Sequence, residues 1–272
     1  MISETFTRSL SQSGEIRLVK LTGGESHNIV PAQAAAQLSC PPQTARHIAA
    51  SAEEKISCTL TEDGVLVEAA GVSAHGGTPG EGENAIGRLM LFLQKLPLKG
   101  ELAQVVSLLA DKIGMEYDGA SLGIAMEDEL SGPLTMNLGV ISGDAQEITI
   151  KLNYRYPVTR SFEECGPQVE AIFQKAGFQV AFLQHKASLY MPQESPLVQK
   201  LLDVYSRCTG QEARPKCIGG GTYAKMMPNT LAFGPIFPGD EVREHKPDEY
   251  MELDRLVDNV TILAHAMYEM AR

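Results

Sequence analysis

Apolar residues recur at every second position in several stretches of the chain, which predicts β-strands. The stretches Ile56–Thr61 and Val65–Ala69 flank Asp63-Gly64, a dipeptide typical of the tight turn in a hairpin. A second antiparallel pair is expected at Leu134–Ile141 and Gln146–Tyr156. Because side chains alternate between the two faces of a strand, the polar residues of the last strand should lie opposite its apolar side.

Other stretches place apolar residues three and four positions apart, the spacing of one face of an α-helix. We expect such helices near residues 42–51, 86–96, 102–113, 161–173, 196–205 and 252–267. The fourth helix follows the capping box Ser161-x-x-Glu164, and the fifth begins at Ser195-Pro196. The last helix should bury an apolar face made of Leu253, Leu256, Val257, Val260, Leu263 and Met267.

The order of these elements indicates two kinds of structure. Strand–strand–helix–strand occurs twice, around residues 15–70 and 133–184, and predicts two similar α+β halves that share one sheet. In the first copy two strands flank Thr22-Gly23-Gly24, and the second is expected to carry Ser26–Pro31, the segment SHNIVP. The last third of the chain instead alternates helix and strand, with a strand at Thr230–Phe233, which is typical of part of a larger α/β domain.

Composition and charge narrow the partners that this chain can have. A formal net charge of −11 is unsuited to nucleic acid or to an anionic membrane surface, both of which bind basic faces. No apolar run approaches the roughly 20 residues of a membrane span, and the N-terminus has no secretory signal. Five cysteines without a CxxC pair favour reduced thiols. We therefore expect a cytoplasmic protein with neither a nucleic-acid nor a membrane partner.

The stretch Cys217–Glu249 holds two candidate site features. Its glycine run leads into Thr222 and a short helix, a setting in which backbone amides can bind an anion. Its loop histidine, His245, lies among acidic residues that can orient a metal ligand. Each feature also has a simpler interpretation, an ordinary turn and a solvated histidine. A nucleotide phosphate is not favoured, because the stretch lacks the GxxxxGK[ST] motif.

Two residues outside this stretch are further candidates. His75 lies in GVSAHGGTP, between a predicted strand and a predicted helix, where an imidazole can stabilise an oxyanion. Arg155 carries a guanidinium suited to binding a carboxylate through two parallel hydrogen bonds. Taken one at a time, a solvated loop histidine and a solvated strand arginine remain the simpler interpretations.

Several segments together form a more specific pattern. They are SHNIVP, GVSAHGGTPGEGENA, LTMNLG, LNYRYP and IGGGTYAKMMPNTLAFGPIFPGDEVREHKPDEY. In this order and spacing they resemble co-catalytic zinc dipeptidases of the dipeptidase V type, which belong to a broader group with aminoacylases and carnosinases. The resemblance covers nearly the whole chain.

This resemblance implies a fold and a reaction. In that family an α/β catalytic domain is interrupted by a lid domain, which in this type is an α+β unit of two ferredoxin-like halves. Residues 10–187 would be the lid, and residues 188–272 the C-terminal part of the α/β catalytic domain. The implied reaction is hydrolysis of a short peptide by a hydroxide shared between two zinc ions, with a glutamate as the general base.

The resemblance also implies residue roles. His245 would be the last zinc ligand, and Glu249 would orient it without binding the metal itself. His75 would polarise the scissile carbonyl and stabilise the tetrahedral intermediate, with Asn28 close to the same group. The substrate's C-terminal carboxylate would be bound by Arg155, Gly220, Gly221 and Thr222.

The sequence departs from the family pattern at the metal-binding positions. The family's His-x-Asp motif does not occur in these 272 residues, and the Glu-Glu and Asp positions that accompany it would belong to an N-terminal half that these residues do not contain. One histidine offers one of the roughly four ligands that a zinc site needs. Lys225 stands where an arginine often follows the glycine turn, and Asp248 replaces a common asparagine. We therefore expect a fragment of a metal-dependent dipeptidase that is inactive as this chain alone.

A different class of function fits the same departures. The chain would then be a non-catalytic remnant that binds peptide or amino-acid carboxylates, or one subunit of a split enzyme completed by a separate N-terminal half.

Overall fold

A computed structural model describes residues 1–218, 220–241, 243 and 248–272. The chain divides into two compact units, Met1–Ser188 and Leu189–Arg272, and each is described by itself. The expected lid began at residue 10. The first unit instead begins at Met1, because residues 2–9 form a strand inside its sheet.

The first unit contains ten strands and four α-helices. Its strands are β1 (Ile2–Ser9), β2 (Arg17–Gly23), β3 (Gln33–Ser39), β4 (Ile56–Thr61), β5 (Gly64–Ala70), β6 (Glu127–Asp128), β7 (Gly132–Pro133), β8 (Thr135–Asp144), β9 (Glu147–Arg155) and β10 (Gln179–His185). Its α-helices are α1 (Pro42–Ala50), α2 (Ala85–Gln94), α3 (Gly100–Lys112) and α4 (Gly166–Lys175). Two 3-10 turns are η1 (Pro79–Glu81) and η2 (Phe162–Glu164).

Eight of the strands form one antiparallel sheet in the order β10-β1-β9-β8-β2-β3-β5-β4. The pairing of β2 with β8 joins a half made of β2 to β5 to a half made of β1, β8, β9 and β10. The expectation of two α+β halves that share a sheet is therefore confirmed. The predicted hairpin is confirmed as well, because β4 and β5 pair with Thr61 opposite Gly64.

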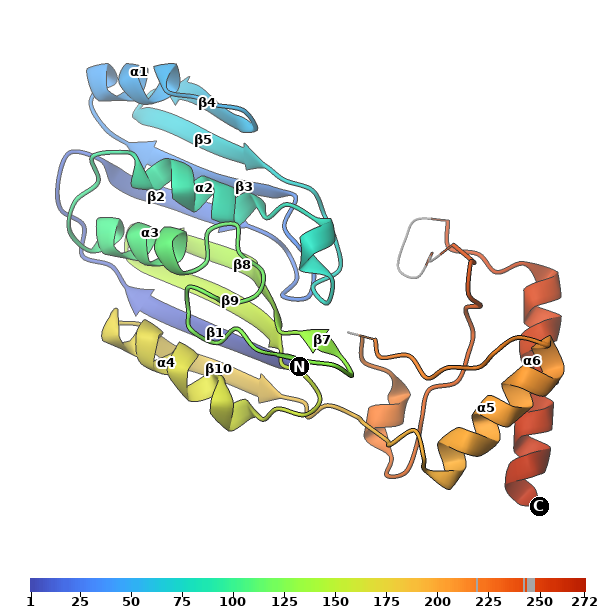
Figure 1. The fold of residues 1–272 in the computed structure, drawn as a ribbon. Coiled ribbons are helices and arrows are strands. Elements are labelled where there is room, and N and C mark those ends of the chain that lie inside the picture. Colours follow the sequence, from blue (N-terminus) through green and yellow to red (C-terminus); the bar gives the residue numbers. More distant parts are fainter. Residues whose placement is uncertain (219, 242, 244–247) are drawn as a thin grey trace. The chain divides into compact units, whose positions relative to one another are not determined.

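All four helices lie on one face of this sheet, as Figure 1 shows, and cover the core. Periodicity predicted their buried faces well: α2 buries Ile86, Leu89, Met90 and Leu93, and α3 buries Leu102, Val105, Val106 and Leu109. The sheet supplies the facing apolar side chains, which on β9 are Ile148, Ile150, Leu152 and Tyr154. The polar residues of β9 alternate with these and take the opposite face of the sheet.

Strand β1 is the element of the first unit that the sequence pattern did not predict. It lies between β9 and β10, and its inward side chains are all buried: Ile2, Glu4, Phe6 and Arg8. Glu4 and Arg8 are ionisable, so the sequence of β1 does not show the alternation of apolar and polar residues expected of a half-buried strand. Both have partners in the fold, because Glu4 accepts a hydrogen bond from Tyr154 and Arg8 donates one to Gln104, each at 2.9 Å.

Residues 114–134 form an irregular segment that contains the small β6–β7 hairpin. Asp128 ties this segment to the loop after β9. Its carboxylate accepts hydrogen bonds from the amide and hydroxyl of Ser131, at 2.5 and 2.9 Å, and from those of Thr159, at 3.0 and 2.9 Å.

The expected strand at Ser26–Pro31 is wrong, because these residues form the loop between β2 and β3. The loop passes close to Gly139 of β8, where a Cβ atom would lie 2.6 Å from His27 Cα. The register of β8 against β9 shifts between Leu138 and Val140, on either side of this glycine. The loop therefore leaves the ladder and projects at one end of the sheet.

The second unit contains α5 (Pro196–Thr209), the 3-10 turn η3 (Tyr223–Met226) and α6 (Leu253–Ala271). As predicted, the Ser195 side chain caps α5 by accepting a hydrogen bond from the Val198 amide at 3.4 Å. The two helices contact each other around a small cluster of Val204, Phe237, Ile262 and Ala266. The strand expected at Thr230–Phe233 is wrong. The described residues of this unit form no sheet with which a strand could pair.

The predicted apolar face of α6 is also exposed rather than buried in this unit. Leu253 is 77% exposed, Val257 62% and Met267 72%, whereas the helix buries Asn259, Ile262 and Ala266. Periodicity identified the apolar stripe correctly, but the described part of the unit packs a neighbouring stripe of the helix. None of the helices in the described ranges combines the length and apolarity that a bilayer span requires.

Candidate functional site

Two loops and the end of one strand meet at one end of the eight-stranded sheet. Strands β2, β5 and β9 run in the same direction and end there, whereas β3 and β8 begin there. Residues 24–32 connect β2 to β3 and carry Asn28, and residues 71–84 connect β5 to α2 and carry His75. Arg155 is the last residue of β9. The topology therefore brings three sequence-predicted residues to one end of the fold.

Backbone hydrogen bonds join the two loops directly. The Gly76 amide donates to the Asn28 carbonyl at 2.6 Å, and the Val30 amide donates to the Ala74 carbonyl at 2.8 Å. Ile29 and His75 form an isolated antiparallel bridge between these bonds. Hydrogen bonds between the backbones of the two loops therefore hold Asn28 and His75 next to each other.

The Arg155 guanidinium lies next to Gly77, in the loop that carries His75. A Cβ atom built on Gly77 would collide with Nη1 of Arg155, and it would lie 3.0 Å from Cε1 and Nδ1 of the His75 ring. Glycine at this position therefore leaves room for the guanidinium and the imidazole to approach each other. The sequence predicted both residues separately, and the structure brings them together.

The hydrogen bonds of His75 and Asn28 define how each side chain can act. The Gly77 amide donates to Nδ1 of His75 at 3.2 Å, so the proton of the neutral ring resides on Nε2. The Ser26 hydroxyl donates to Oδ1 of Asn28 at 2.5 Å, which leaves the amide nitrogen of Asn28 as the donor end. His75 is exposed and Asn28 half-buried, so both can be reached from solvent.

The surroundings of these residues are positively charged. Burial lowers the pKa of His27, and the nearby charges of Lys151, Arg155 and Lys186 lower it further. Burial also lowers the pKa of Arg155, which nevertheless stays charged because an arginine in a protein does not deprotonate near neutral pH. A concentration of positive charge on a protein of net charge −11 favours an anionic ligand at this end of the sheet.

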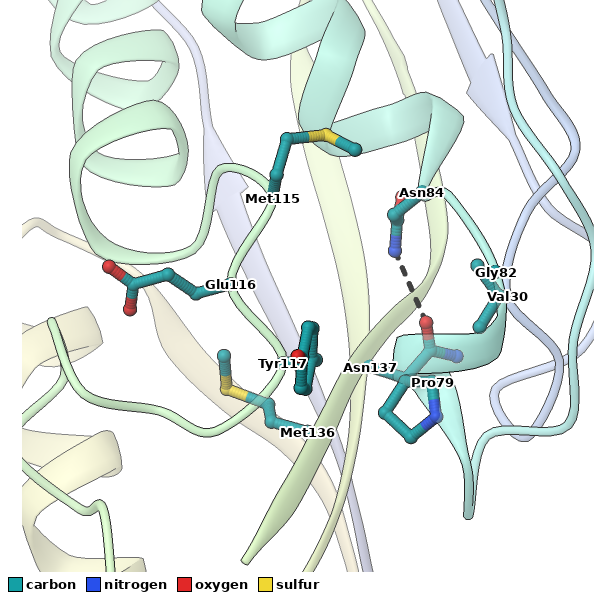
Figure 2. A pocket seen from close by; sticks show the side chains of 9 residues that line it. All are labelled: Val30, Pro79, Gly82, Asn84, Met115, Glu116, Tyr117, Met136 and Asn137. Atoms are coloured by element: carbon teal, nitrogen blue, oxygen red, sulfur yellow. Dashed lines mark hydrogen bonds between the residues drawn. The ribbon is translucent and has the colours of Figure 1, made fainter.

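A pair of side-chain amides behind the loops, the buried Asn137 and the half-buried Asn84, was missed by the sequence analysis. The amide nitrogen of Asn137 donates to the carbonyls of His27 and Ile29, at 3.1 and 2.8 Å. Its oxygen accepts a hydrogen bond from Asn84 at 3.2 Å, as Figure 2 shows. One signal was available in the sequence, since Asn137 interrupts the apolar run of strand β8 between Met136 and Leu138.

The glycine turn lies in the second unit, and its described part is open. The Thr222 side chain caps η3 by accepting a hydrogen bond from the Ala224 amide at 3.2 Å. A Cβ atom on Gly221 would meet no described atom within 4 Å. The packing of the described chain therefore does not by itself require glycine at Gly221. The relation of this turn to His75 and Arg155 stays a prediction.

The described residues do not fit a metal site. No group of three or more histidine, cysteine, aspartate or glutamate residues in the described ranges is arranged to hold a metal ion. The predicted zinc ligand, His245, lies outside the described residues, and Glu249 is exposed. The predicted zinc ligation therefore stays a prediction.

The fold and the motifs agree with a known class of protein. Residues 62–180 match the family model of the M20 peptidase dimerisation domain. This part of the chain is therefore similar to a peptidase dimerisation domain, and the resemblance to dipeptidases drawn from the sequence motifs is confirmed.

Individual relatives give the same result. The chain is 31% identical over 261 residues to "Putative dipeptidase YtjP" of Bacillus subtilis, an alignment that covers 94% of this chain and 56% of that protein. It is 27% identical over 264 residues to "Putative dipeptidase SSP1012" of Staphylococcus saprophyticus, again covering 94% and 56%. The chain thus spans about half the length of these curated relatives.

A solved structure shares the fold. The crystal structure of aminoacylhistidine dipeptidase from Vibrio alginolyticus matches with a TM-score of 0.52 and 15% identity, covering 99% of this chain and 61% of that one. At this level of identity the match supports the fold alone.

Proposed function

We propose that the first unit binds the substrate of a metal-dependent dipeptidase, a short peptide with a free C-terminal carboxylate. The observation that carries this proposal is the meeting of His75, Asn28 and Arg155 at one end of the sheet. Each residue suits a different part of a peptide, and the relatives named as dipeptidases supply the class of reaction.

The proposed roles follow from the donors that each side chain offers. Arg155 binds the C-terminal carboxylate through its guanidinium, supported by the positive surroundings that also lower the pKa of His27. His75 donates from Nε2 to the oxygen of the scissile carbonyl, where negative charge develops during hydrolysis. Asn28 donates to the same oxygen from its amide nitrogen.

In the second unit, the glycine turn is proposed as a carboxylate-binding segment on the strength of the motif. Gly220, Gly221 and Thr222 offer backbone donors in a turn whose described surroundings leave space for a ligand. His245 is proposed as a zinc ligand on the strength of the motif alone, with Glu249, four residues later, as the carboxylate that orients it.

We further propose that this chain by itself hydrolyses no peptide. The described residues offer no group of metal ligands, and such a group would have to come from additional polypeptide. Two observations support this. The relatives extend well beyond the matched region, and α6 exposes an apolar stripe suited to packing against a protein surface. Hydrolysis of dipeptides by the purified chain, with zinc or manganese added, tests the proposal, and robust turnover would contradict it.

A non-catalytic protein or split-enzyme subunit that binds peptide carboxylates is the second candidate. It is favoured by the lack of a group of metal ligands among the described residues, because Arg155 can bind a carboxylate without a metal. Adding an N-terminal segment cut from a full-length relative separates the two. Restored turnover identifies a split enzyme or fragment, whereas peptide binding without turnover identifies a non-catalytic binder.

A cytoplasmic location is proposed on the state of the thiols. All five cysteines are free, and Cys208 and Cys217 are exposed. Exposed thiols without disulfides are typical of a reducing compartment.

A further inference from the structure

Asn137, the third residue of β8, makes contacts that are unusual for a residue inside a strand. It is only 2% exposed, yet its side chain makes no bond to the strand ladder on either side. Its amide nitrogen donates to the carbonyls of His27 and Ile29, the residues on either side of Asn28. A single side chain thus holds the loop at the two positions that bracket a candidate site residue.

Asn84 connects Asn137 to a rigid element. Its oxygen caps α2 by accepting hydrogen bonds from the Ile86 and Gly87 amides, at 2.9 and 3.2 Å. Its nitrogen donates to Asn137 at 3.2 Å and to the Leu138 carbonyl at 2.9 Å. Both ends of one amide are therefore used, one for the helix and one for β8.

Packing alone does not lock this arrangement in place. A cavity of about 60 Å³ lies beside the two amides, lined also by Met115, Tyr117 and Met136 (Figure 2). Side chains do not fill this space, so packing against the amides is incomplete on that side. The hydrogen bonds of Asn137 therefore contribute to holding the loop in place, and the Asn28 carbonyl in turn accepts a hydrogen bond from the Gly76 amide next to His75.

We propose that Asn84 and Asn137 are positioning residues, which fix the loop of Asn28 and thereby the backbone and ring of His75. The inference rests on the function proposed above, in which His75 and Asn28 contact the substrate carbonyl. Neither amide touches the substrate. They act through the loop, and their loss should move His75 without unfolding the sheet.

The chain offers a matched control at the register partner of Asn137. Asn153 lies directly opposite on β9, is fully buried, and donates from its amide to the Ile2 carbonyl of β1 at 2.9 Å. It is the same residue type at the same depth in the sheet, but the bond that it makes leads away from the loop. A purely structural effect of losing a buried amide should therefore appear equally in both positions.

The test compares three variants of the full chain by NMR, without any ligand. Asn84→Ser keeps an uncharged hydroxyl that can cap α2, but its side chain is too short to replace the bond from the Asn84 amide nitrogen to Asn137. Asn137→Leu removes both donors to the loop at similar side-chain volume, and Asn153→Leu is the control. Hydrogen–deuterium exchange is measured at the Gly76 and Val30 amides, together with the pH titration of the His75 ring protons.

We expect Asn84→Ser and Asn137→Leu to speed exchange at Gly76 and Val30 by at least tenfold and to change the His75 titration. Asn153→Leu should leave both readouts at wild-type values even if its unfolding midpoint falls. Wild-type exchange and titration in Asn84→Ser would overturn the inference, and so would equal changes in Asn153→Leu. Peptide binding is measured separately. If the loop loosens as expected but the wild type binds no dipeptide, the positioning role stands and the proposed function fails.

Discussion

Glu4 gives the most quantitative test of the fold, because it is a carboxyl group in the core of the first unit. It is fully buried on β1, with Leu152 and Leu183 opposite it on the neighbouring strands. One oxygen accepts the Tyr154 hydroxyl at 2.9 Å, and the other has no hydrogen-bond partner among the described atoms. Burial raises the pKa of Glu4 from 4.5 to about 7, with Glu170 adding to this effect and the Tyr154 hydrogen bond opposing it.

The sign of the pH dependence follows from the higher pKa in the folded state. Above pH 4.5 the unfolded chain releases the proton of Glu4, whereas the folded chain keeps it until about pH 7. Stability therefore falls as the pH rises through this range, by about 1.4 kcal/mol per pH unit, and the total loss is about 3 kcal/mol. Above pH 7 this contribution is constant.

Glu4→Gln tests this reasoning, because glutamine keeps the shape and the acceptor for Tyr154 but cannot ionise. Urea unfolding between pH 4.5 and 8.5 is followed by far-ultraviolet circular dichroism, since the chain contains no tryptophan. The variant should match the wild type near pH 4.5 and exceed it by about 3 kcal/mol at pH 8.

Tyr154→Phe provides the complementary arm of this experiment. Removing the hydroxyl takes away a hydrogen bond that lowers the pKa of Glu4. In the variant, the fall in stability with rising pH should therefore continue to a higher pH than in the wild type. Parallel pH profiles of the wild type and Glu4→Gln would refute the reasoning, because Glu4 would then titrate alike in the folded and unfolded chain.

Three further outcomes are expected. Burial alone would raise the pKa of Asp128, but its hydrogen bonds to Ser131 and Thr159 lower it. Asp128→Asn should therefore lower the free energy of unfolding by about 2 kcal/mol at pH 7. In urea unfolding, the variant should also lose less stability than the wild type as the pH falls below about 4. Gly77→Ala displaces the flexible end of Arg155, so calorimetry should show a stability loss below about 1 kcal/mol, whereas dipeptide binding weakens several-fold. Val257→Lys with Val260→Glu should lower concentration-dependent self-association and the fluorescence of a hydrophobic dye at unchanged helix content, because both residues are exposed on α6.

Local patterns in the sequence were sufficient for most helices and hairpins of the first unit. The turn at Asp63-Gly64, the cap at Ser161 and the apolar stripes of α2 and α3 depend on residues close together in the chain. Periodicity reports such contacts directly. It did not find β1, whose buried Glu4 and Arg8 have hydrogen-bond partners more than 90 positions away.

The errors in the second unit have a different origin. The apolar stripe of α6 and the expected strand at Thr230–Phe233 were identified from their own sequence, but burial and strand pairing require a partner surface. The pattern records that these segments are suited to packing. It does not record whether the described chain supplies the surface on which they pack.

The candidate site was predictable as a set of residues and not as an arrangement. Motif resemblance selected His75, Asn28 and Arg155, but only the sheet order brings β5, β9 and the loop before β3 to the same end. The Asn84–Asn137 pair was not predicted because its role depends on hydrogen bonds between loops that are distant in sequence.

The central claim is that Arg155 binds the carboxylate of a short peptide, and one NMR titration tests it directly. A dipeptide and its C-terminal amide are each added to the isotope-labelled chain, to an Arg155→Met variant, and to an Arg160→Met control. Arg160 is an exposed arginine paired with Glu164. An isolated carboxylate site of this kind should bind in the millimolar range, about −4 kcal/mol.

The account predicts that the free dipeptide shifts the Gly76 and Gly77 amides in the wild type and in Arg160→Met. The amidated peptide should shift neither amide, and Arg155→Met should respond to neither peptide. Equal responses to the acid and the amide, or a response that survives Arg155→Met, would contradict it.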